Sequence, residues 1–156
     1  MTQLRVLQVI EATTAGVKRH VLSLVRGLDR DRFVITVACP PVRSHAYHDV
    51  YFADELRAAG IHTYFLPMRR SINPLSDARV IHQLGQYLQS EPFDLIHLHS
   101  SKAGLVGRLA VAAYGISVPV LYTPNAFAFQ GKGRWTRLPY LWAERFLSHW
   151  TTMLIC

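Results

Sequence analysis

The sequence predicts an α/β domain, a Rossmann-like three-layer αβα arrangement around a mostly parallel sheet. Short runs rich in Val, Ile and Leu alternate with amphipathic stretches of helical period along the chain, a pattern typical of βαβ units. The strand-like runs are apolar almost throughout, as expected where helices cover both faces of a sheet. With 156 residues, we expect one domain, over residues 1–156, with a single sizeable core.

Each predicted element follows from apolar spacing and from start and stop signals. Asn73 and Pro74 are typical of a helix start, with Asn as the cap and Pro at the first helical position. Gly60 and Gly115 follow helical runs and indicate helix ends. The predicted strands are 4–10, 33–39, 61–66, 94–99, 118–123 and 152–156, and the predicted helices are 17–28, 49–59, 73–88, 103–114 and 137–149.

Composition narrows the function classes. Half of the residues are hydrophobic, which excludes a disordered chain, and only 17% are charged, which suggests that another domain or a membrane covers part of the surface. The formal charge of +7 suits an anionic partner, whether nucleic acid, anionic lipid or a phosphorylated small molecule. We find no signal peptide and no apolar run long enough to span a membrane, so we expect a cytoplasmic protein.

The cysteines and the last residues of the chain allow two further inferences. Two cysteines, Cys39 and Cys156, are too few for a disulfide framework, and their spacing matches no metal motif. The last residues, Met153–Cys156, are apolar and strand-like. We therefore expect that further protein follows this segment.

Topology predicts where a ligand would bind. In a doubly wound sheet the ligand lies beyond the carboxyl ends of the strands, where the strand order reverses. If the order is 3-2-1-4-5-6, the reversal falls between the first and fourth strands. The loops that border it are then 11–16, 100–102 and 124–133.

The first of these loops contains Gly16, directly before a predicted helix. A glycine there lets the backbone approach a phosphate, and the helix N-terminus favours an anion. An ordinary tight turn is the alternative interpretation. The loop matches neither GxGxxG nor GxxxxGK[ST], which disfavours a dinucleotide-dependent dehydrogenase or epimerase and a P-loop NTPase.

The fourth strand ends in His97 and His99, which lie two residues apart and so face the same side of the sheet. A pair of histidines can bind a metal, but no third ligand of suitable type is close in sequence. We interpret His97 as a packed or hydrogen-bonded strand histidine, and we consider a place in the crevice for His99. We expect no metal.

The next helix opens with Ser100, Ser101 and Lys102. A serine here is a helix cap, and the lysine brings positive charge to the predicted crevice. The alternative is a solvated lysine on a capped helix. Glycines at 104 and 107 weaken the helix, so close packing is expected to require them.

A mixture of basic and aromatic residues follows the fifth strand. Such a mixture is typical of a membrane-interface surface, but also of a helix packed on its sheet with its charges outward. We favour the second interpretation for most of these residues. They are Lys132, Arg134, Trp135, Arg137, Trp142, Arg145 and Trp150.

Three segments together resemble the N-terminal domain of retaining GT-B glycosyltransferases of the group 1, or GT4-like, family. They are Leu4–Glu11 with Gly16 and its helix, the block Phe93–Gly104, and the block Val120–Phe127. The resemblance covers essentially the whole chain, and the middle block is its most specific part. It implies that this domain is one half of a GT-B fold.

The resemblance also implies a reaction, the transfer of a sugar from a nucleotide-sugar donor to an acceptor. In this family the N-terminal domain mainly holds the acceptor, while a C-terminal domain, absent from this chain, binds the nucleotide, and a metal or cofactor is usually not required. Gly16 matches the glycine loop that approaches the donor phosphates. Ser100, Ser101 and Lys102 match the loop that faces the acceptor.

Two positions depart from the family pattern. The glycine loop commonly carries two adjacent glycines, whereas Ala15 precedes Gly16 here. The loop after the fifth strand commonly carries a histidine, and Asn125 holds that place. An asparagine cannot act as a base, but it can hydrogen-bond a sugar hydroxyl or a phosphate. The identity of a catalytic residue is therefore left open.

The sequence thus predicts one half of a glycosyltransferase that acts on a saccharide or lipid-linked acceptor in cell-envelope polysaccharide synthesis. An inner-membrane surface is a further expected partner, and nucleic acid is not. The alternative is a non-catalytic basic domain that binds an anionic partner or a membrane and helps to assemble a polysaccharide machine.

Overall fold

A computed structural model describes residues 2–41, 51–125 and 133–156. The described strands form one sheet in the order β3-β2-β1-β4-β5-β6, and neighbouring strands run parallel. The Rossmann-like class and the expected strand order are both confirmed. The strands are β1 (Leu4–Ile10), β2 (Phe33–Cys39), β3 (His62–Phe65), β4 (Leu95–His99), β5 (Val120–Thr123) and β6 (Met153–Leu154).

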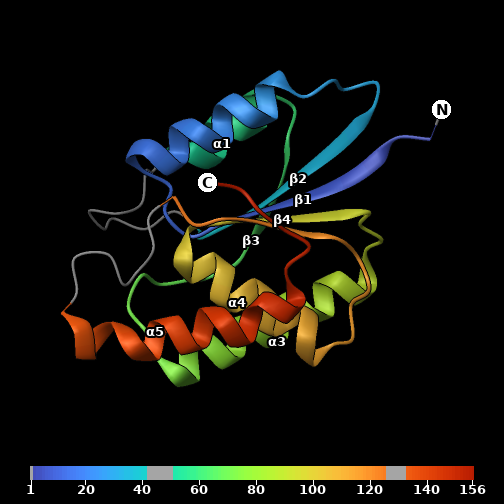
Figure 1. The fold of residues 1–156 in the computed structure, drawn as a ribbon. Helices are drawn as coiled ribbons and strands as arrows, with labels where there is room; N and C mark the ends of the chain where they lie inside the picture. Colours follow the sequence, from blue (N-terminus) through green and yellow to red (C-terminus); the bar gives the residue numbers. More distant parts are fainter. Residues whose placement is uncertain (1, 42–50, 126–132) are drawn as a thin grey trace.

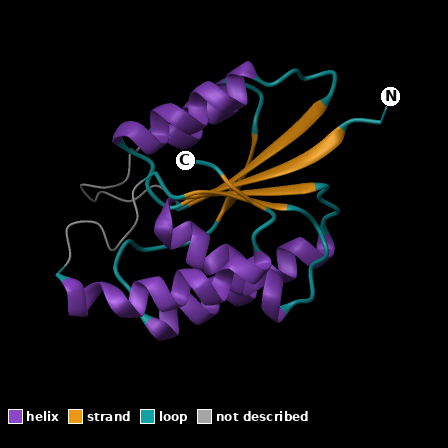
Figure 2. Ribbon diagram, in the orientation of Figure 1, coloured by secondary structure: helices purple, strands orange, loops and turns teal. Residues whose placement is uncertain are grey.

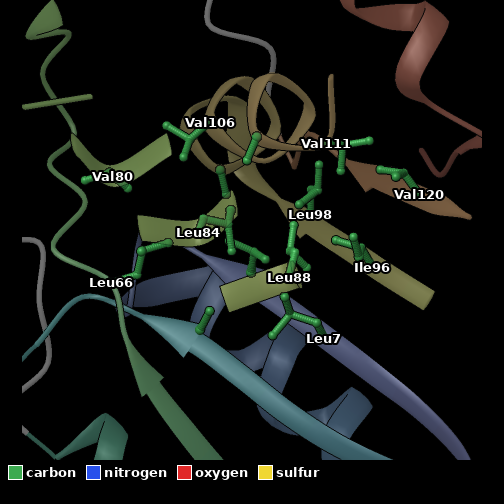
Figure 3. Close-up of a cluster of buried hydrophobic side chains, with 14 of the residues drawn as sticks. Leu7, Leu66, Val80, Leu84, Leu88, Ile96, Leu98, Val106, Val111 and Val120 are labelled. Atoms are coloured by element: carbon green, nitrogen blue, oxygen red, sulfur yellow. The ribbon is translucent and has the colours of Figure 1, made fainter. Parts of the chain in front are cut away.

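Helices cover both faces of this sheet (Figures 1 and 2). On one face, α1 and α2 pack over β1 and β2 through a cluster that includes Val21, Phe52 and Val37. On the other, α3 and α4 enclose the larger core shown in Figure 3, which includes Leu84, Val106 and Leu98. The helices are α1 (Ala15–Gly27), α2 (Phe52–Ala58), α3 (Pro74–Ser90), α4 (Ser100–Ala113) and α5 (Arg134–Leu147).

Element bounds differ from the predicted ones mainly after β5. We predicted a helix over 137–149, but α5 begins at Arg134 and ends at Leu147, before a 3₁₀ turn at Ser148–Trp150. Pro139 lies inside α5, where its ring and missing N–H normally disfavour a helix. The predicted strand 152–156 is reduced to two residues. The start of the helix predicted at 49–59, residues 49 and 50, lies outside the described residues, as do Lys132 and most of loop 124–133.

The Arg108 side chain contacts residues of α4, β5 and α5. Its side chain is buried, and its guanidinium lies 4.2 Å from the centre of the Tyr122 ring. It donates to the carbonyl oxygen of Gly104 at 2.8 Å and to the Glu144 carboxylate at 2.9 Å. The Tyr122 hydroxyl donates to the other oxygen of Glu144 at 3.2 Å. A buried arginine is tolerated here because its charge is paired and because two of its nitrogens donate hydrogen bonds.

Glycine at 104 is required by this packing, as the sequence predicts. A Cβ added there would lie 2.4 Å from a ring carbon of Tyr122. The ring cannot move aside readily because it is buried beneath Arg108. Gly107 is in a similar position, since its Cβ would lie 2.3 Å from a methyl group of Leu98.

We therefore expect Gly104→Ala to destabilise the fold by about 1–3 kcal/mol, the usual cost of overpacking a core. Urea unfolding measures this change. The matched control is Gly27→Ala, because a Cβ at Gly27 meets nothing within 4 Å and alanine favours the helix. Equal stability of the two variants would contradict the packing argument.

Candidate functional site

Three residues with left-handed backbone lie at the carboxyl ends of adjacent strands. Ala15 (φ 54°) follows β1, Ser100 (φ 78°) follows β4, and Asn125 (φ 59°) follows β5. These are the non-glycine residues with positive φ among those described. Such a conformation costs about 1–2 kcal/mol for an ordinary side chain and tends to gather at binding sites. The rim of β1, β4 and β5 is therefore the candidate site.

Ala15 and Gly16 open α1 at this rim, and both are exposed. The left-handed backbone at Ala15 is one that glycine adopts freely, so the structure explains why glycine suits this position. Gly16 is different. It has no positive φ, and a Cβ there would meet nothing within 4 Å. Among the described residues, neither backbone conformation nor packing accounts for a glycine at 16.

The N-terminus of α1 also lies at this rim. Thr14 makes no side-chain capping hydrogen bond, and the first turn holds no acidic residue. The first backbone N–H groups of a helix have no partner within it, and the helix dipole adds positive potential there. The start of α1 can therefore accept an anionic group.

The three predicted site residues that follow β4, Ser100, Ser101 and Lys102, make different contacts. Ser100 is the first residue of α4, and its hydroxyl accepts from the N–H of Ala103 at 3.4 Å. Ser101 hydrogen-bonds the Tyr122 side chain, so the Ser101 hydroxyl makes a structural contact. Burial is the main reason that the pKa of Tyr122 rises to about 12.

Lys102 is buried, which corrects the alternative of a solvated lysine. Its ammonium group lies 2.5 Å from an oxygen of Asp77 and donates to the carbonyl oxygen of Ser71 at 3.1 Å. Asp77 is also buried and accepts from the N–H of Asn73 at the start of α3. The ammonium group has three donors, and described residues account for two.

Glu11, at the end of β1, is the charged residue that our sequence analysis missed. Only 3% of its surface is exposed, and its Oε1 accepts no hydrogen bond from the described residues. Burial raises the pKa of this carboxyl, although the positive charges of Arg70 and Lys102 oppose the rise. The available signal was a carboxylate directly after an apolar strand, since such a residue is rarely buried without a reason.

The histidines of β4 are structural. His97 hydrogen-bonds the Thr123 hydroxyl at 2.9 Å, and His99 hydrogen-bonds the oxygen of the Gln8 amide at 2.7 Å. The interpretation of His97 as a hydrogen-bonded strand residue is confirmed. His99 is fully buried, so its side chain does not line the crevice as we considered, because the sheet neighbours and α1 enclose it. The described residues hold no group of three metal-ligating side chains.

Asn125 is the rim residue that follows β5. Its side chain is exposed, and its amide donates to the carbonyl oxygen of Thr123 at 3.3 Å. Asparagine tolerates left-handed backbone better than most residues. The rim thus brings together Ala15, Gly16, Ser100 and Asn125 from three adjacent loops, with Lys102 buried close behind them. None of the described helices is long and apolar enough to cross a membrane.

Comparisons with known proteins identify the family and the fold of the chain. Residues 15–156 match the family described as the glycosyl transferase 4-like domain. The chain is 34% identical over 144 residues to UDP-Gal:alpha-D-GlcNAc-diphosphoundecaprenol alpha-1,3-galactosyltransferase of Escherichia coli, covering 91% of this chain and 35% of that protein. It is 30% identical to an uncharacterized protein of the Klebsiella pneumoniae cps region, covering 97% of this chain and 39% of that one. The chain therefore spans little more than a third of these relatives.

Solved structures share the fold at low sequence identity. HepE of Anabaena in complex with UDP and glucose superposes with a TM-score of 0.68 at 17% identity, covering 99% of this chain and 38% of that protein. MurG of Acinetobacter baumannii superposes with a TM-score of 0.65 at 14% identity, covering 97% and 40%. A UDP-N-acetylglucosamine 2-epimerase superposes equally well, with a TM-score of 0.66 at 15% identity.

The buried ion pair generates one prediction. Asp77→Asn leaves the Lys102 charge buried without its counter-charge, so we expect the free energy of unfolding to fall by about 3–5 kcal/mol. The double variant Asp77→Asn/Lys102→Met removes both charges and should recover most of the loss. Urea unfolding of the parent, of Asp77→Asn, of Lys102→Met and of the double variant gives the coupling free energy. A single variant as stable as the parent would show that the pair is not buried as described.

The histidines generate a pH prediction. Burial lowers the pKa of His97 from 6.5 to about 4 and that of His99 to about 2. Below pH 6.5 the unfolded chain gains protons that the folded protein does not, so stability is lost as pH falls. Each histidine contributes a slope of about 1.4 kcal/mol per pH unit. Denaturation between pH 7 and 4 should show a shallower slope for His97→Asn, and an unchanged slope would contradict the assignment.

Proposed function

This chain belongs to the glycosyl transferase 4-like domain family, and we propose that the whole protein transfers a sugar from a nucleotide-sugar to a saccharide or lipid-linked acceptor. The relative from E. coli is named for transfer from UDP-Gal to a diphosphoundecaprenol-linked sugar, which supports a uridine nucleotide and a lipid-linked acceptor. The relative in the cps region and a putative glycosyltransferase EpsD of Bacillus subtilis support a role in cell-envelope polysaccharide synthesis.

The described domain forms the acceptor side of the site, and a C-terminal domain outside this chain binds the nucleotide. The observation that carries this proposal is the rim of Ala15, Ser100 and Asn125, where three adjacent strands end in left-handed residues. Gly16 stands at that rim without a structural requirement among the described residues. A diphosphate that approaches the backbone from the other domain would supply the requirement, because a side chain would block it.

In the proposed reaction, the bond between the sugar C1 and the diphosphate oxygen breaks while a bond from C1 to an acceptor hydroxyl oxygen forms. The resemblance to retaining enzymes implies attack from the same face, with the hydroxyl proton passing to the departing diphosphate. The N-terminus of α1 stabilises the charge that develops on that diphosphate. Asn125 is placed to hydrogen-bond a sugar hydroxyl or a phosphate.

A lipid-linked acceptor places the protein on the cytoplasmic face of the inner membrane as a peripheral protein. We also propose that no metal takes part, so transfer should continue when EDTA is added to the assay.

The test is Gly16→Ala in the intact protein, assayed for transfer of labelled sugar from UDP-galactose and other UDP-sugars to lipid-linked N-acetylglucosamine diphosphate. We expect the rate to fall roughly tenfold or more, because a methyl group obstructs the diphosphate. Stability should not fall, since alanine is the better helix former. Gly27→Ala, at the other end of α1, is the matched control and should retain the parent rate.

A Gly16→Ala protein with the parent rate would reject the role of this loop. The alternative of a non-catalytic basic domain makes a different prediction, namely an intact protein that binds anionic vesicles but transfers no sugar from any UDP-sugar offered.

A further inference from the structure

The Glu11 carboxylate is buried without contacts that explain its presence. The buried charged side chains among the described residues are those of Glu11, Asp77, Lys102 and Arg108. Asp77 and Lys102 pair with each other, and Arg108 pairs with Glu144. Glu11 differs from them, because its Oε1 is buried and accepts no hydrogen bond from a described residue. A buried polar atom of this kind requires an explanation.

A contribution to stability does not explain Glu11. Burial raises the pKa of this carboxyl, and the positive charges of Arg70 and Lys102 oppose the rise without cancelling it. The folded protein therefore disfavours the ionised side chain relative to the unfolded chain. A titratable residue that is unfavourable for the fold and lies at the edge of a candidate site is typical of a functional group. Glu11 is thus a candidate for contact with a ligand.

Glu11 lies among charged residues from three loops at one edge of the sheet. It directly follows β1, while Arg70 lies in the loop between β3 and α3, and Lys102 lies in the first turn of α4. The strands β1 to β4 are parallel, so these loops leave the sheet at the same edge, where α1 and α4 also begin (Figure 1). Both positive charges act on Glu11. The carboxylate therefore lies close to the rim and to Lys102.

The chemistry of these groups favours hydroxyl groups as the ligand. An ionised Glu11 repels a phosphate, whereas a hydroxyl group donates a strong hydrogen bond to a carboxylate. Lys102 donates to Asp77 and Ser71, which leaves one of its three donors without an acceptor among the described residues. One hydroxyl group can donate to Glu11 while its neighbour accepts from Lys102. Adjacent hydroxyl groups of this kind are those of a sugar ring.

The Glu11 side chain can reach such a ligand by a change of rotamer. Oε1 is shielded from solvent, so the contact requires the carboxylate to turn toward the rim. No hydrogen bond from a described residue to Oε1 breaks in that turn. The turn gives the oxygen a partner and lessens the burial that raises the pKa of Glu11. The contact is therefore favourable for the ionised carboxylate.

We propose that Glu11 binds a hydroxyl group of the acceptor sugar and so helps to determine which acceptor the protein uses. The proposal rests on the proposed function, because that function makes this domain the acceptor side of the site. It divides the rim into two parts. The start of α1 contacts the diphosphate of the donor, and Glu11 contacts a sugar.

The first experiment is isothermal titration calorimetry of the intact protein with two ligands, UDP and a water-soluble N-acetylglucosamine diphosphate that carries a short alkyl chain. We expect Glu11→Gln to weaken binding of the sugar ligand roughly tenfold or more, because a hydrogen bond to a charged group is replaced by a weaker one. UDP should bind within about twofold of the parent affinity, since the start of α1 is unchanged.

A second experiment tests the contact itself with analogues of the same ligand that each lack one ring hydroxyl group. The parent should bind one of these analogues roughly tenfold more weakly than the complete ligand, because the carboxylate then loses its partner. In Glu11→Gln this difference should shrink to about twofold or less, since the interaction between residue and hydroxyl group is already weakened. A purely structural effect of the substitution would lower the affinity for all analogues equally.

Two further variants serve as controls. Glu144→Gln removes a partly buried carboxylate that pairs with Arg108, so it should lower stability and leave the affinity for the sugar ligand unchanged. Glu11→Asp keeps the charge but shortens the side chain, so it should also weaken binding of the sugar ligand. Glu11→Gln should be at least as stable as the parent in urea unfolding, because it removes a buried charge that the fold disfavours.

Three results would overturn the proposal. Glu11→Gln binds the sugar ligand as tightly as the parent, it loses as much affinity for UDP as for the sugar, or it loses as much stability as Asp77→Asn, which would make Glu11 a structural residue. A parent that transfers sugar while Glu11→Gln retains full affinity for the sugar ligand rejects this inference alone. A parent that neither binds the sugar ligand nor transfers sugar rejects the proposed function, and this inference with it.

Discussion

The reversal of strand order between β1 and β4 is the constraint on which the site depends. Because all neighbouring strands are parallel, the carboxyl ends of β1, β4 and β5 meet at one edge, and the chain must leave each in a different loop. The left-handed residues Ala15, Ser100 and Asn125 are the sharp turns by which it does so. Ala15, Gly16 and Asn125 are exposed at this edge, and none of them has a long side chain.

Ion pairs beneath this edge of the sheet connect the elements that carry the rim loops. The Lys102–Asp77 pair joins the start of α4 to the start of α3, while Glu11 remains buried with one oxygen unpaired among the described residues. On the other side of α4, Arg108 joins β5 to α5 through Glu144. Each of these pairs is costly to break once it is buried. They hold the loops and α5 in fixed positions relative to the sheet.

The fold could be predicted almost completely from the sequence, because apolar periodicity determines which segments are strands and helices. The sequence also indicated the three rim loops, and the need for glycine at 104. It did not reveal that Glu11 is buried, that Lys102 is ion-paired with Asp77, or that His99 is enclosed. Those facts depend on contacts between residues far apart in the chain, such as 77 and 102, for which local spacing carries no signal. The sequence analysis favoured a helix packed on the sheet for most of the basic and aromatic residues after β5, but Trp135 is 80% exposed and Trp142 is 70% exposed.

The central claim is that the edge formed by β1, β4 and β5 contacts the donor diphosphate and the acceptor. A crystal structure of the intact protein with UDP and an acceptor analogue tests it most directly. The account predicts a phosphate oxygen within hydrogen-bond distance of a backbone N–H at the start of α1, and an acceptor hydroxyl beside Ser100 or Asn125. A complex in which both ligands bind without touching any of these residues would contradict it.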